Sequence, residues 1–388
     1  MYKDTSASAT KLREGVSTGS CACAAALAAL EYLLTGQSPP TVSVPLPPIV
    51  HDRPRAWLEI AIARCGKAFA APADQALPNC ASASVIKDAG DDPDVTHHAE
   101  IVVSLRLFPQ ARQCCYIRIA GAKGVGKITL PGLPLPVGAW AINPVPRQQI
   151  RFALKKRWQE LARTSQPPMT VTISVPDGER LAQQTFNPRL GIVGGLSILG
   201  THGTVKAFSH AAFAATIAEA LSVAKALKLP VLYCCTGRRS ERLLQMRFPG
   251  APLQAFVQAA DFVAYTLHKA HRTGFSRIIW GCFFGKLVKL AQGHGQTHAR
   301  RHALDFALLA QSCAAAGPVT CQAIRAATTA REALELLLAH PRGLAIIARL
   351  TQKASEVASH FARQPVEVHL FHLDGRELAS FPEQRKSL

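Results

Sequence analysis

Four aspartates lie within seven residues of one another, in a chain whose formal charge is +19. Neighbouring carboxylates repel, so such a cluster needs cations, backbone donors or a chemical task to offset the repulsion. Gly90 permits a positive φ and Pro93 favours an extended residue before it, so the run predicts a turn. The aspartates are Asp88, Asp91, Asp92 and Asp94.

Two roles are open for this acidic run. A carboxylate at the turn between Gly90 and Pro93 would stabilise a cationic centre or take a proton from a substrate, which makes Asp91 and Asp92 the catalytic candidates. The structural alternative is a loop fixed by carboxylates that accept backbone N–H groups. A calcium loop of the EF-hand type is excluded, because the alternating ligand spacing and the closing Glu are missing.

A second polar group precedes the first predicted helix. Ser17, Thr18 and Ser20 come before or at the start of an apolar run over Cys21–Leu34, which Thr35-Gly36 ends. The hydroxyls and the free N–H groups at a helix start form a natural site for a carboxylate or phosphate. An ordinary N-cap is the structural alternative.

Two glycine-rich segments follow. Gly121–Lys127 is a near miss to a phosphate-binding P-loop, but Ile128 replaces the required Ser or Thr, and the prolines after it forbid the required helix. The segment Asn187–Val205 leads into a helix predicted over His210–Leu227. Its glycines indicate close approach of the backbone to a ligand or a tight crossover between domains.

The elements around these motifs predict an α/β protein of two domains. We expect a strand-rich α+β domain over residues 1–190 and a layered α/β domain over residues 191–388. The expected strands are 41–46, 56–63, 101–107, 116–120, 171–175, 231–234, 277–280 and 366–371. The other expected helices are 146–163, 239–247, 259–273 and several after residue 285.

Composition restricts the class of protein. Hydrophobic residues make up 48% of the chain, too many for disorder, and aromatic residues only 6%, few for stacking on nucleic acid. The 44 basic residues are spread along the chain, which suits a small polyanion but is also what a solubility effect alone would give. The polar start, the eleven cysteines without a C-x-x-C motif, and the charges that interrupt Ala211–Leu227 predict a cytoplasmic protein without a membrane span.

Together, these motifs resemble the cobalt-precorrin-5B (C-1) methyltransferase family of anaerobic cobalamin biosynthesis. The resemblance runs in family order over about Arg13 to Ala379. The matching stretches are REGVSTGSCACAAALAAL, VIKDAGDDPDVTHHAEI, GAKGVGKITLPGLPLPVGAWAINPVPRQQI, FNPRLGIVGGLSILGTHGTV, GKLVKLAQGHGQTHAR and VEVHLFHLDGRELA. The sequence departs from the family pattern at Ser17–Cys21, at Lys206–Ser209, at Gly281–Gly285 and at Gln296–Ala299, where Ala299 replaces a hydroxyl residue.

The resemblance implies S-adenosylmethionine-dependent methylation of ring carbon C-1 of cobalt-precorrin-5B to give cobalt-precorrin-6A. It also implies that the cobalt belongs to the substrate, so that no protein-bound metal is expected. The catalytic candidates within the matching stretches are Asp91, Asp92 and His298. The candidates for the cofactor site are Gly191, Gly194, Gly195, Gly200, Thr201 and Gly203. The candidates for holding substrate carboxylates are Ser17, Thr18, Ser20, Lys87, Arg147, Arg189 and Lys286, for which structural pairing is the alternative.

Two other functions remain open on the sequence. One is a nucleotide- or phosphate-dependent enzyme that uses Gly121–Lys127, and the other is a non-catalytic binder of an acidic ligand, which the net charge would favour. The common methyltransferase fold is not expected. The strand predicted at Val231–Cys234 is followed by Cys235-Thr236-Gly237-Arg238, with no carboxylate for a ribose.

Overall fold

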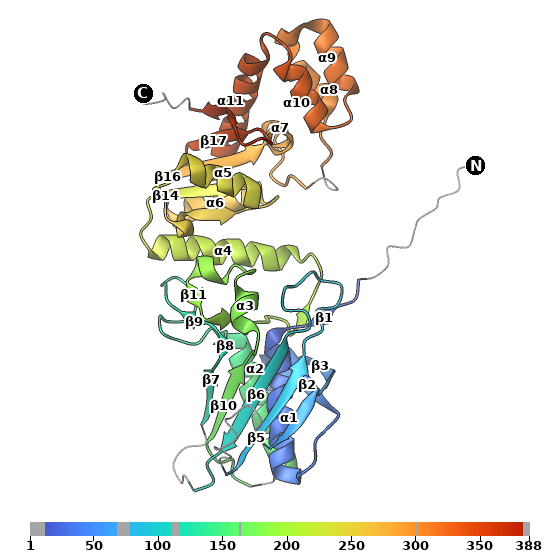
Figure 1. Ribbon diagram of the computed structural model, residues 1–388, viewed down its shortest axis with the longest axis vertical. Helices are drawn as coiled ribbons and strands as arrows, with labels where there is room; N and C mark the ends of the chain where they lie inside the picture. Colours follow the sequence, from blue (N-terminus) through green and yellow to red (C-terminus); the bar gives the residue numbers. More distant parts are fainter. Residues whose placement is uncertain (1–11, 68–77, 111–115, 163, 299–301, 383–388) are drawn as a thin grey trace, which may run out of the picture. The chain divides into compact units, whose positions relative to one another are not determined.

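The computed structural model describes residues 12–67, 78–110, 116–162, 164–298 and 302–382 (Figure 1). The chain forms two compact units, Met1–Ser209 and His210–Leu388. Each unit has its own buried core. The core of the first unit contains residues from Cys21 to Ile198. The second unit has two hydrophobic clusters, with residues from Ile217 to Phe371. The expected α/β organisation in two domains is therefore confirmed.

The first unit is built on a five-stranded mixed sheet with strand order β4-β5-β6-β10-β7. Its strands are β4 (Arg64–Lys67), β5 (Cys80–Ile86), β6 (Glu100–Leu107), β10 (Met169–Ser174) and β7 (Ile117–Gly121). Only the pair β10 and β7 is parallel. Alternate residues such as Ile101, Val103 and Leu105 are buried. This period of two places one apolar face of the sheet against the helices.

Helices α1 (Thr18–Thr35) and α2 (Pro144–Leu161) supply a large part of this core, to which Val42, Val44 and Ile60 also contribute (Figure 1). The Ser17 side chain accepts a hydrogen bond from the Ser20 N–H at the start of α1, and Gly36, with φ +75°, caps its end. The first turns of α1 are Ala and Cys, so the backbone of α1 can approach β5 and β6 closely. By length and composition α1 could cross a membrane, but 72% of that stretch is buried, as in a core helix.

The remaining elements of this unit are a long hairpin, three pairs of short strands and two helical turns. A hairpin is formed by β2 (Thr41–Val50) and β3 (Arg53–Ala61). β1 (Gly15–Val16) pairs with β13 (Thr204–Val205), β8 (Gly124–Val125) with β12 (Gly195–Leu196), and β9 (Lys127–Ile128) with β11 (Ile192–Val193). The helical turns are α3 (Gly178–Ala182) and η1 (Asn187–Leu190).

The boundary between the units lies between Ser209 and His210, later than the boundary expected after residue 190. The physical reason is strand pairing. The glycine-rich segment forms β11, β12 and β13, and all three pair with strands of the first unit. The segment therefore belongs entirely to the first unit, and the second unit begins with α4.

The second unit contains a five-stranded sheet with strand order β15-β14-β16-β17-β18. The first four strands of this order are parallel, and β18 is antiparallel to β17. The strands are β15 (Phe256–Gln258), β14 (Val231–Cys235), β16 (Arg277–Phe283), β17 (Val366–Phe371) and β18 (Glu377–Phe381). Parallel strands buried on both faces explain the nearly continuous apolar runs of β14 and β16.

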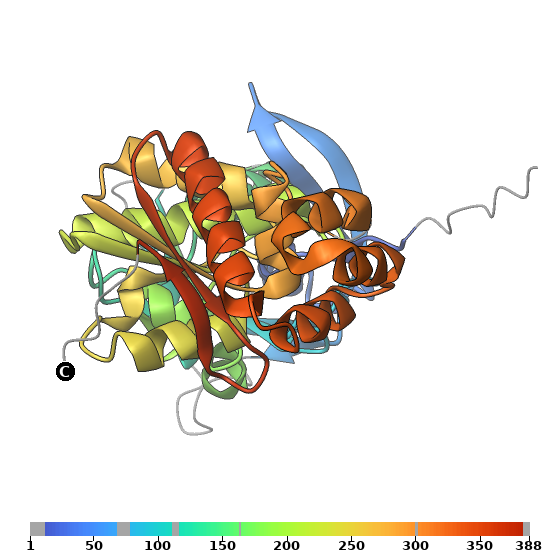
Figure 2. The ribbon, with the colours of Figure 1, turned by 90° about the horizontal axis from the view of Figure 1, so that it is seen from above.

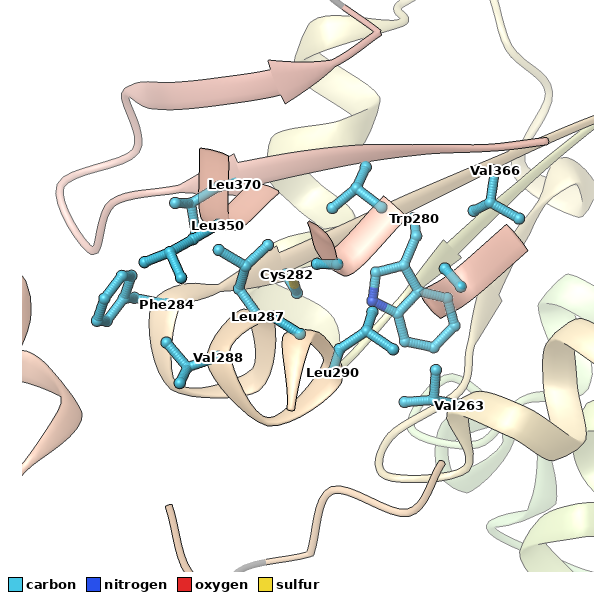
Figure 3. Packing of buried hydrophobic residues seen from close by; sticks show 14 of the residues in the cluster. Val263, Trp280, Cys282, Phe284, Leu287, Val288, Leu290, Leu350, Val366 and Leu370 are labelled. Carbon is cyan, nitrogen blue, oxygen red and sulfur yellow. The ribbon is translucent and has the colours of Figure 1, made fainter. Parts of the chain in front are cut away.

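Helices cover both faces of this sheet. Trp280, Cys282 and Leu370 point to the face that packs on α4 (His210–Ala226), α6 (Val263–Thr273), α7 (Phe284–Ala291) and α11 (Gly343–Ala362), as Figure 3 shows in part. Tyr233 and Ile279 point to the other face, toward Leu244 of α5 (Arg238–Arg247). Figure 2 shows α11 lying along β17 and β18. The remaining helices are α8 (Phe306–Ser312), α9 (Gly317–Ala326) and α10 (Ala330–Leu338), with the turns η2 (Leu253–Ala255) and η3 (Ala314–Ala316).

The elements expected from the sequence are present, with ends shifted by a few residues. The strands that were not expected are β1, β4, β5, β8, β9, β11, β12, β13, β15 and β18. The nine cysteines in the described part of the chain are free thiols, whereas Cys114, Cys115 and Ala299 lie outside it.

Candidate functional site

Every aspartate of the acidic run has a partner within the first unit. The Asp88 carboxylate pairs with the Arg13 guanidinium and accepts the Gly90 N–H at 2.9 Å. Hydrogen bonding to Arg13, followed by that to Gly90, lowers the pKa of Asp88 to about 2. Asp91 Oδ2 accepts the Arg13 N–H at 2.6 Å. Asp92 Oδ1 accepts the Phe208 N–H at 3.2 Å.

These contacts tie the acidic run to two other segments. The Val16 N–H donates to the Asp88 carbonyl at 2.7 Å, and Gly90 forms a bridge with Glu14. A Cβ on Gly15 or Gly90 would meet backbone atoms of the other segment within 2.3 Å. The structure thus gives the run the loop-fixing contacts of the structural alternative, and a catalytic role of Asp91 or Asp92 stays a prediction.

Lys87 lies inside the first unit. Its side chain is 1% exposed, and its Nζ donates to Asp94 Oδ2 at 2.7 Å. Asp94 Oδ1 also accepts the Thr96 N–H and hydroxyl, each at 2.7 Å. Although burial raises the pKa of Asp94, the charge of Lys87 and these hydrogen bonds outweigh it and lower the pKa. Lys87 is therefore part of an ion pair inside the first unit. Its expected role in holding the substrate stays a prediction.

The hydroxyls at the start of α1 hold the glycine-rich segment. Ser17, Thr18 and Ser20 are each less than 5% exposed. Thr18 Oγ1 accepts the Leu199 N–H at 2.9 Å and lies 3.1 Å from the Leu199 carbonyl. Ser20 Oγ accepts from Gln149 Nε2 at 3.0 Å. The start of α1 and the segment 197–203 therefore pack on each other. Substrate binding by the three hydroxyls stays a prediction.

Close packing accounts for most of the glycines expected at a cofactor site. A Cβ on Gly195 would lie 2.2 Å from the Gly124 carbonyl group, and one on Gly200 would lie 2.2 Å from Ser17 Oγ. Gly191 and Gly203 have positive φ and pack on side chains of their neighbours. Gly194 and Thr201 are exposed, and Gly194 has open space around it. The described backbone of this segment thus forms a packed junction, and its role in cofactor binding stays a prediction.

The same junction contains the P-loop-like segment. β8 pairs with β12, and β9 pairs with β11. A Cβ on Gly124 would lie 1.8 Å from the Val175 carbonyl oxygen. Val125 and Gly126 are buried. The backbone of residues 124–126 therefore packs against protein, including the second glycine-rich segment.

Arg147 and Arg189, expected to hold substrate carboxylates, are half-buried in the first unit. All three nitrogens of the Arg147 guanidinium donate to backbone carbonyls, those of Ile142 at 2.7 Å, Ile119 at 3.0 Å and Trp140 at 3.5 Å. Burial, with a smaller contribution from Arg151, lowers the pKa of Arg147. The contacts of Arg147 hold the start of α2. Arg189 lies in η1.

Lys286 and His298 belong to the second unit. The Lys286 ammonium pairs with Asp261 and donates to the Thr297 carbonyl at 3.1 Å. Thr297 Oγ1 donates to Asp261 Oδ1 at 3.0 Å, and the His298 N–H donates to Gln296 Oε1 at 3.2 Å. These contacts anchor the segment 296–298 beside α7. The residues expected to form the site are thus divided between the two units.

The second unit has a pocket of about 770 Å³ at the carboxyl ends of β14 and β16. The chain leaves β14 for β15 on one side, and leaves β16 for β17 on the other. The crevice between two such strands is the usual ligand site of an open parallel sheet. The lining residues are Thr236, Gly237, Arg238, Arg239, Ser240, Phe283, Gly285, Lys286, Lys289, Ala303, Leu304, Phe306, Thr328 and Ala330.

The sequence-based prediction included only Lys286 of these lining residues. The signal for the others was present. A buried strand at Val231–Cys235 is followed by Thr236 and Gly237 and then by a helix, as at the carboxyl edge of a parallel sheet. In the sequence, this pattern argues only against the common methyltransferase fold. Lys289 had no signal of its own, because a lysine on α7 looks like an ordinary surface residue.

The described residues contain no group of three or more His, Cys, Asp or Glu side chains that would hold a metal ion. His298, one of the histidines scattered along the chain, makes its observed contacts within the protein.

Comparison with known proteins identifies the family. The family model described as CbiD matches residues 5–207, and the model described as CbiD, C-terminal domain, matches residues 296–381. A Nitratidesulfovibrio vulgaris protein named cobalt-precorrin-5B C(1)-methyltransferase is 46% identical over 375 residues, covering 95% of this chain and 92% of that protein. A Polaromonas sp. protein of the same name is 39% identical and covers 95% of this chain and 96% of its own length.

A crystal structure of a cobalamin biosynthesis protein (cbiD) from Archaeoglobus fulgidus is 25% identical, with a TM-score of 0.37, and covers 75% of this chain and 83% of that one. The family models together reach into both units, and the curated relatives match nearly the whole chain. The chain therefore belongs to the CbiD family.

Proposed function

We propose that this protein transfers a methyl group from S-adenosyl-L-methionine to ring carbon C-1 of cobalt-precorrin-5B, giving cobalt-precorrin-6A. The observation that carries the proposal is the 46% identity to a protein named for this methylation, over 95% of the chain. Identity of this extent covers the elements of both units, including the strands and loops that form the pocket of the second unit.

S-adenosyl-L-methionine, when bound, supplies an electrophilic methyl carbon on a sulfonium. The protein has to hold the acceptor carbon, orient it and exclude water, because a displacement of this kind depends chiefly on position. A pocket at the carboxyl edge of a sheet, with apolar walls, suits this requirement.

The described residues do not form an open cradle for the methyl donor at the glycine-rich segment. Gly195 and Gly200 pack against protein atoms, and the neighbouring hydroxyls of Ser17 and Thr18 already have protein partners. The pocket of the second unit offers basic side chains and, among the described lining residues, no carboxylate for the ribose diol. The proposal therefore assigns no residues to the donor.

The test is a reaction of the purified protein with cobalt-precorrin-5B and S-adenosylmethionine that carries a ¹³C-labelled methyl group. We expect a product heavier by one methyl group, with the label attached at C-1 in its NMR spectrum. The N. vulgaris relative, run in parallel, shows that the substrate is competent. Absence of methylated product from this protein, with methylation by the relative, would refute the proposal.

We also propose a cytoplasmic location. The support is that the nine described cysteines are free thiols, whereas oxidising compartments favour disulfides. Fractionation of cells that produce the protein would test it, and recovery in a secreted fraction would contradict it.

A further inference from the structure

The lining of the pocket in the second unit is strongly cationic. Arg238 and Arg239 begin α5, and Lys286 and Lys289 lie on α7. Among the described lining residues, no Asp or Glu balances these four charges, and Asp261, which pairs with Lys286, is not part of the lining. A pocket with this charge selects an anionic ligand.

The Lys289 ammonium is buried and has fewer hydrogen-bond partners than it can bind. Its side chain is only 8% exposed, and in the described part of the chain its Nζ has one hydrogen bond, to the Thr297 carbonyl at 3.2 Å. An ammonium has three N–H donors, and burying it without a carboxylate partner is costly. Burial lowers the pKa of Lys289, the nearby charge of Lys286 lowers it further, and Asp261 opposes them. An anion in the pocket would supply the missing partner.

The two arginines differ in how firmly they are held. Arg239 donates from Nη2 to the Leu373 carbonyl at 3.0 Å and lies over the Phe283 ring, 5.6 Å from its centroid. Arg238 is exposed, and among the described residues its guanidinium forms no hydrogen bond or ion pair. A guanidinium without a protein partner at the rim of a cationic pocket is suited to a carboxylate, which matches its two parallel donors.

The walls between these cations are apolar. Phe283 and Phe306 contribute rings, and Leu304, Ala303 and Ala330 contribute aliphatic surface. An apolar wall edged with cations fits a ligand that is flat and apolar at its centre and anionic at its periphery. A tetrapyrrole that carries acetate and propionate side chains has this form. A sulfonium does not fit, because its positive charge would lie among Arg238, Arg239 and Lys289, for which no carboxylate partner is seen among the described residues.

We propose that the pocket between β14 and β16 binds carboxylate side chains of the tetrapyrrole substrate, with Lys289 and Arg238 as the groups that hold them. This assignment rests on the proposed function for the identity of the substrate, and it deepens that function by naming the substrate site. The flat ring lies against Phe283 and Phe306, and its carboxylates meet the buried ammonium and the guanidinium at the rim.

The test measures binding to the full-length protein without a methyl donor. One probe is a cobalt corrinoid with free acetate and propionate side chains, and the other is the same corrinoid with those side chains amidated. The variants are Lys289→Met, which removes the charge and keeps the length of the side chain, and Arg238→Gln. Lys353→Met and Arg349→Gln are matched controls, because these residues are exposed on α11 and do not line the pocket.

We expect the dissociation constant of the carboxylated probe to rise about tenfold or more in each pocket variant, because a hydrogen bond to a charged group is lost. The preference for the carboxylated over the amidated probe should fall with it, and both controls should bind as wild type does. Unchanged affinity and unchanged preference in both pocket variants would overturn the assignment. If Lys289→Met does not fold, Arg238→Gln decides the outcome by itself.

Two further measurements separate this assignment from the proposed function. Stronger binding of ATP than of the carboxylated corrinoid, in competition, would assign the pocket to a phosphate ligand and overturn the proposal. In the methylation assay, the KM for cobalt-precorrin-5B should rise in Arg238→Gln more than kcat falls, because the lost contact is made in the ground state too. Wild-type KM in a variant of an active enzyme would refute the site and leave the methylation in place.

Discussion

At the scale of single residues, the acidic run shows how a basic protein uses its carboxylates. Each aspartate of the run accepts hydrogen bonds from a group elsewhere in the first unit, and Lys87 is buried beneath them. The repulsion among the four charges is offset by Arg13, Lys87 and backbone donors. The run therefore serves to hold the segments 13–16 and 203–208 in place, whatever else it does.

Replacing Asp94 by Asn should destabilise the first unit strongly. The amide oxygen still accepts from Thr96, but the buried Lys87 ammonium loses its only carboxylate among the contacts observed. Removing one partner of a buried pair costs about 3 kcal/mol, or roughly 6–12 °C in Tm for a unit of this size. Thermal unfolding followed by circular dichroism measures the loss.

The double variant Lys87→Met with Asp94→Asn is the control, since it removes both charges and should recover part of the Tm. The pKa of Asp94 is lowered in the folded protein, so its contribution is present above its usual pKa and is lost as the pH falls through the folded value. The Tm difference between wild type and Asp94→Asn should therefore shrink in strong acid. A double variant less stable than Asp94→Asn would contradict the ion-pair explanation.

Asp91 and Asp92 allow the structural and catalytic roles to be separated. Asn keeps an oxygen that accepts from Arg13 N–H or Phe208 N–H, whereas Ala removes it. We expect Asp91→Asn and Asp92→Asn to keep the wild-type Tm but to lower kcat, because only transition-state interactions of the carboxylate are lost, and the Ala variants to lower the Tm as well. Turnover of the methylation reaction and thermal unfolding are measured on the same samples. Folded Asn variants with wild-type kcat would contradict the catalytic role and leave only the loop-fixing role.

At the scale of secondary structure elements, two glycine-rich segments pair with each other. β8 runs parallel to β12, and β9 runs antiparallel to β11. Glycine is required where the strands approach, because a Cβ on Gly124 or Gly195 would overlap backbone atoms. The junction closes the end of the first unit and carries the chain to the second.

Gly195→Ala should disrupt this junction. The added Cβ would lie 2.2 Å from the carbonyl group of Gly124, so one of the two backbones has to move. We expect failure to fold or a loss above roughly 3 kcal/mol, as for other severe overpacking. Gly66→Ala in β4 is the matched control, because its Cβ position has no atom within 4 Å and its φ is not positive.

The control should change stability by no more than about 1 kcal/mol. Chemical denaturation of both variants provides the comparison. A Gly195→Ala protein that unfolds at the wild-type midpoint would show that close packing does not explain this glycine.

At the scale of the whole molecule, the chain consists of two units with separate cores. No buried cluster in the described residues combines side chains from before Ser209 with side chains from after it. The second unit has a complete sheet with helices on both faces, and its pocket is lined by its own residues. Each unit therefore has what a domain needs to fold independently.

The fragment 210–388, produced alone, should unfold cooperatively. Its clusters include Trp280 on one face of the sheet (Figure 3) and Tyr233 on the other, and all their buried members come from this unit. Differential scanning calorimetry together with Trp fluorescence tests this expectation. A broad transition without an unfolding enthalpy typical of its size would show that the first unit is needed for the core.

The amino-acid sequence alone determined the local structure. The period of two predicted β6 and β10, and Ser17 with Gly36 marked both ends of α1, because these signals depend on neighbours along the chain. The motifs, taken together, also led to the family. Strand β5 was not predicted from the sequence, because Ala and Ser alternate in it. Such residues form a core strand only because they pack on the Ala-rich helix α1.

Only the tertiary structure decided what the polar and glycine residues do. Lys87, Arg147 and the hydroxyls at the start of α1 are the residue types of an anion site. Arg147 and Thr18 bind backbone groups of segments distant in the sequence, whereas Lys87 pairs with Asp94 of the same acidic run. The same holds for the pocket, which the loops after β14 and β16 form together with residues near 304 and 330. Whether a group is buried, paired or open to a ligand depends on contacts across the fold, and such contacts leave no periodic signal in the chain.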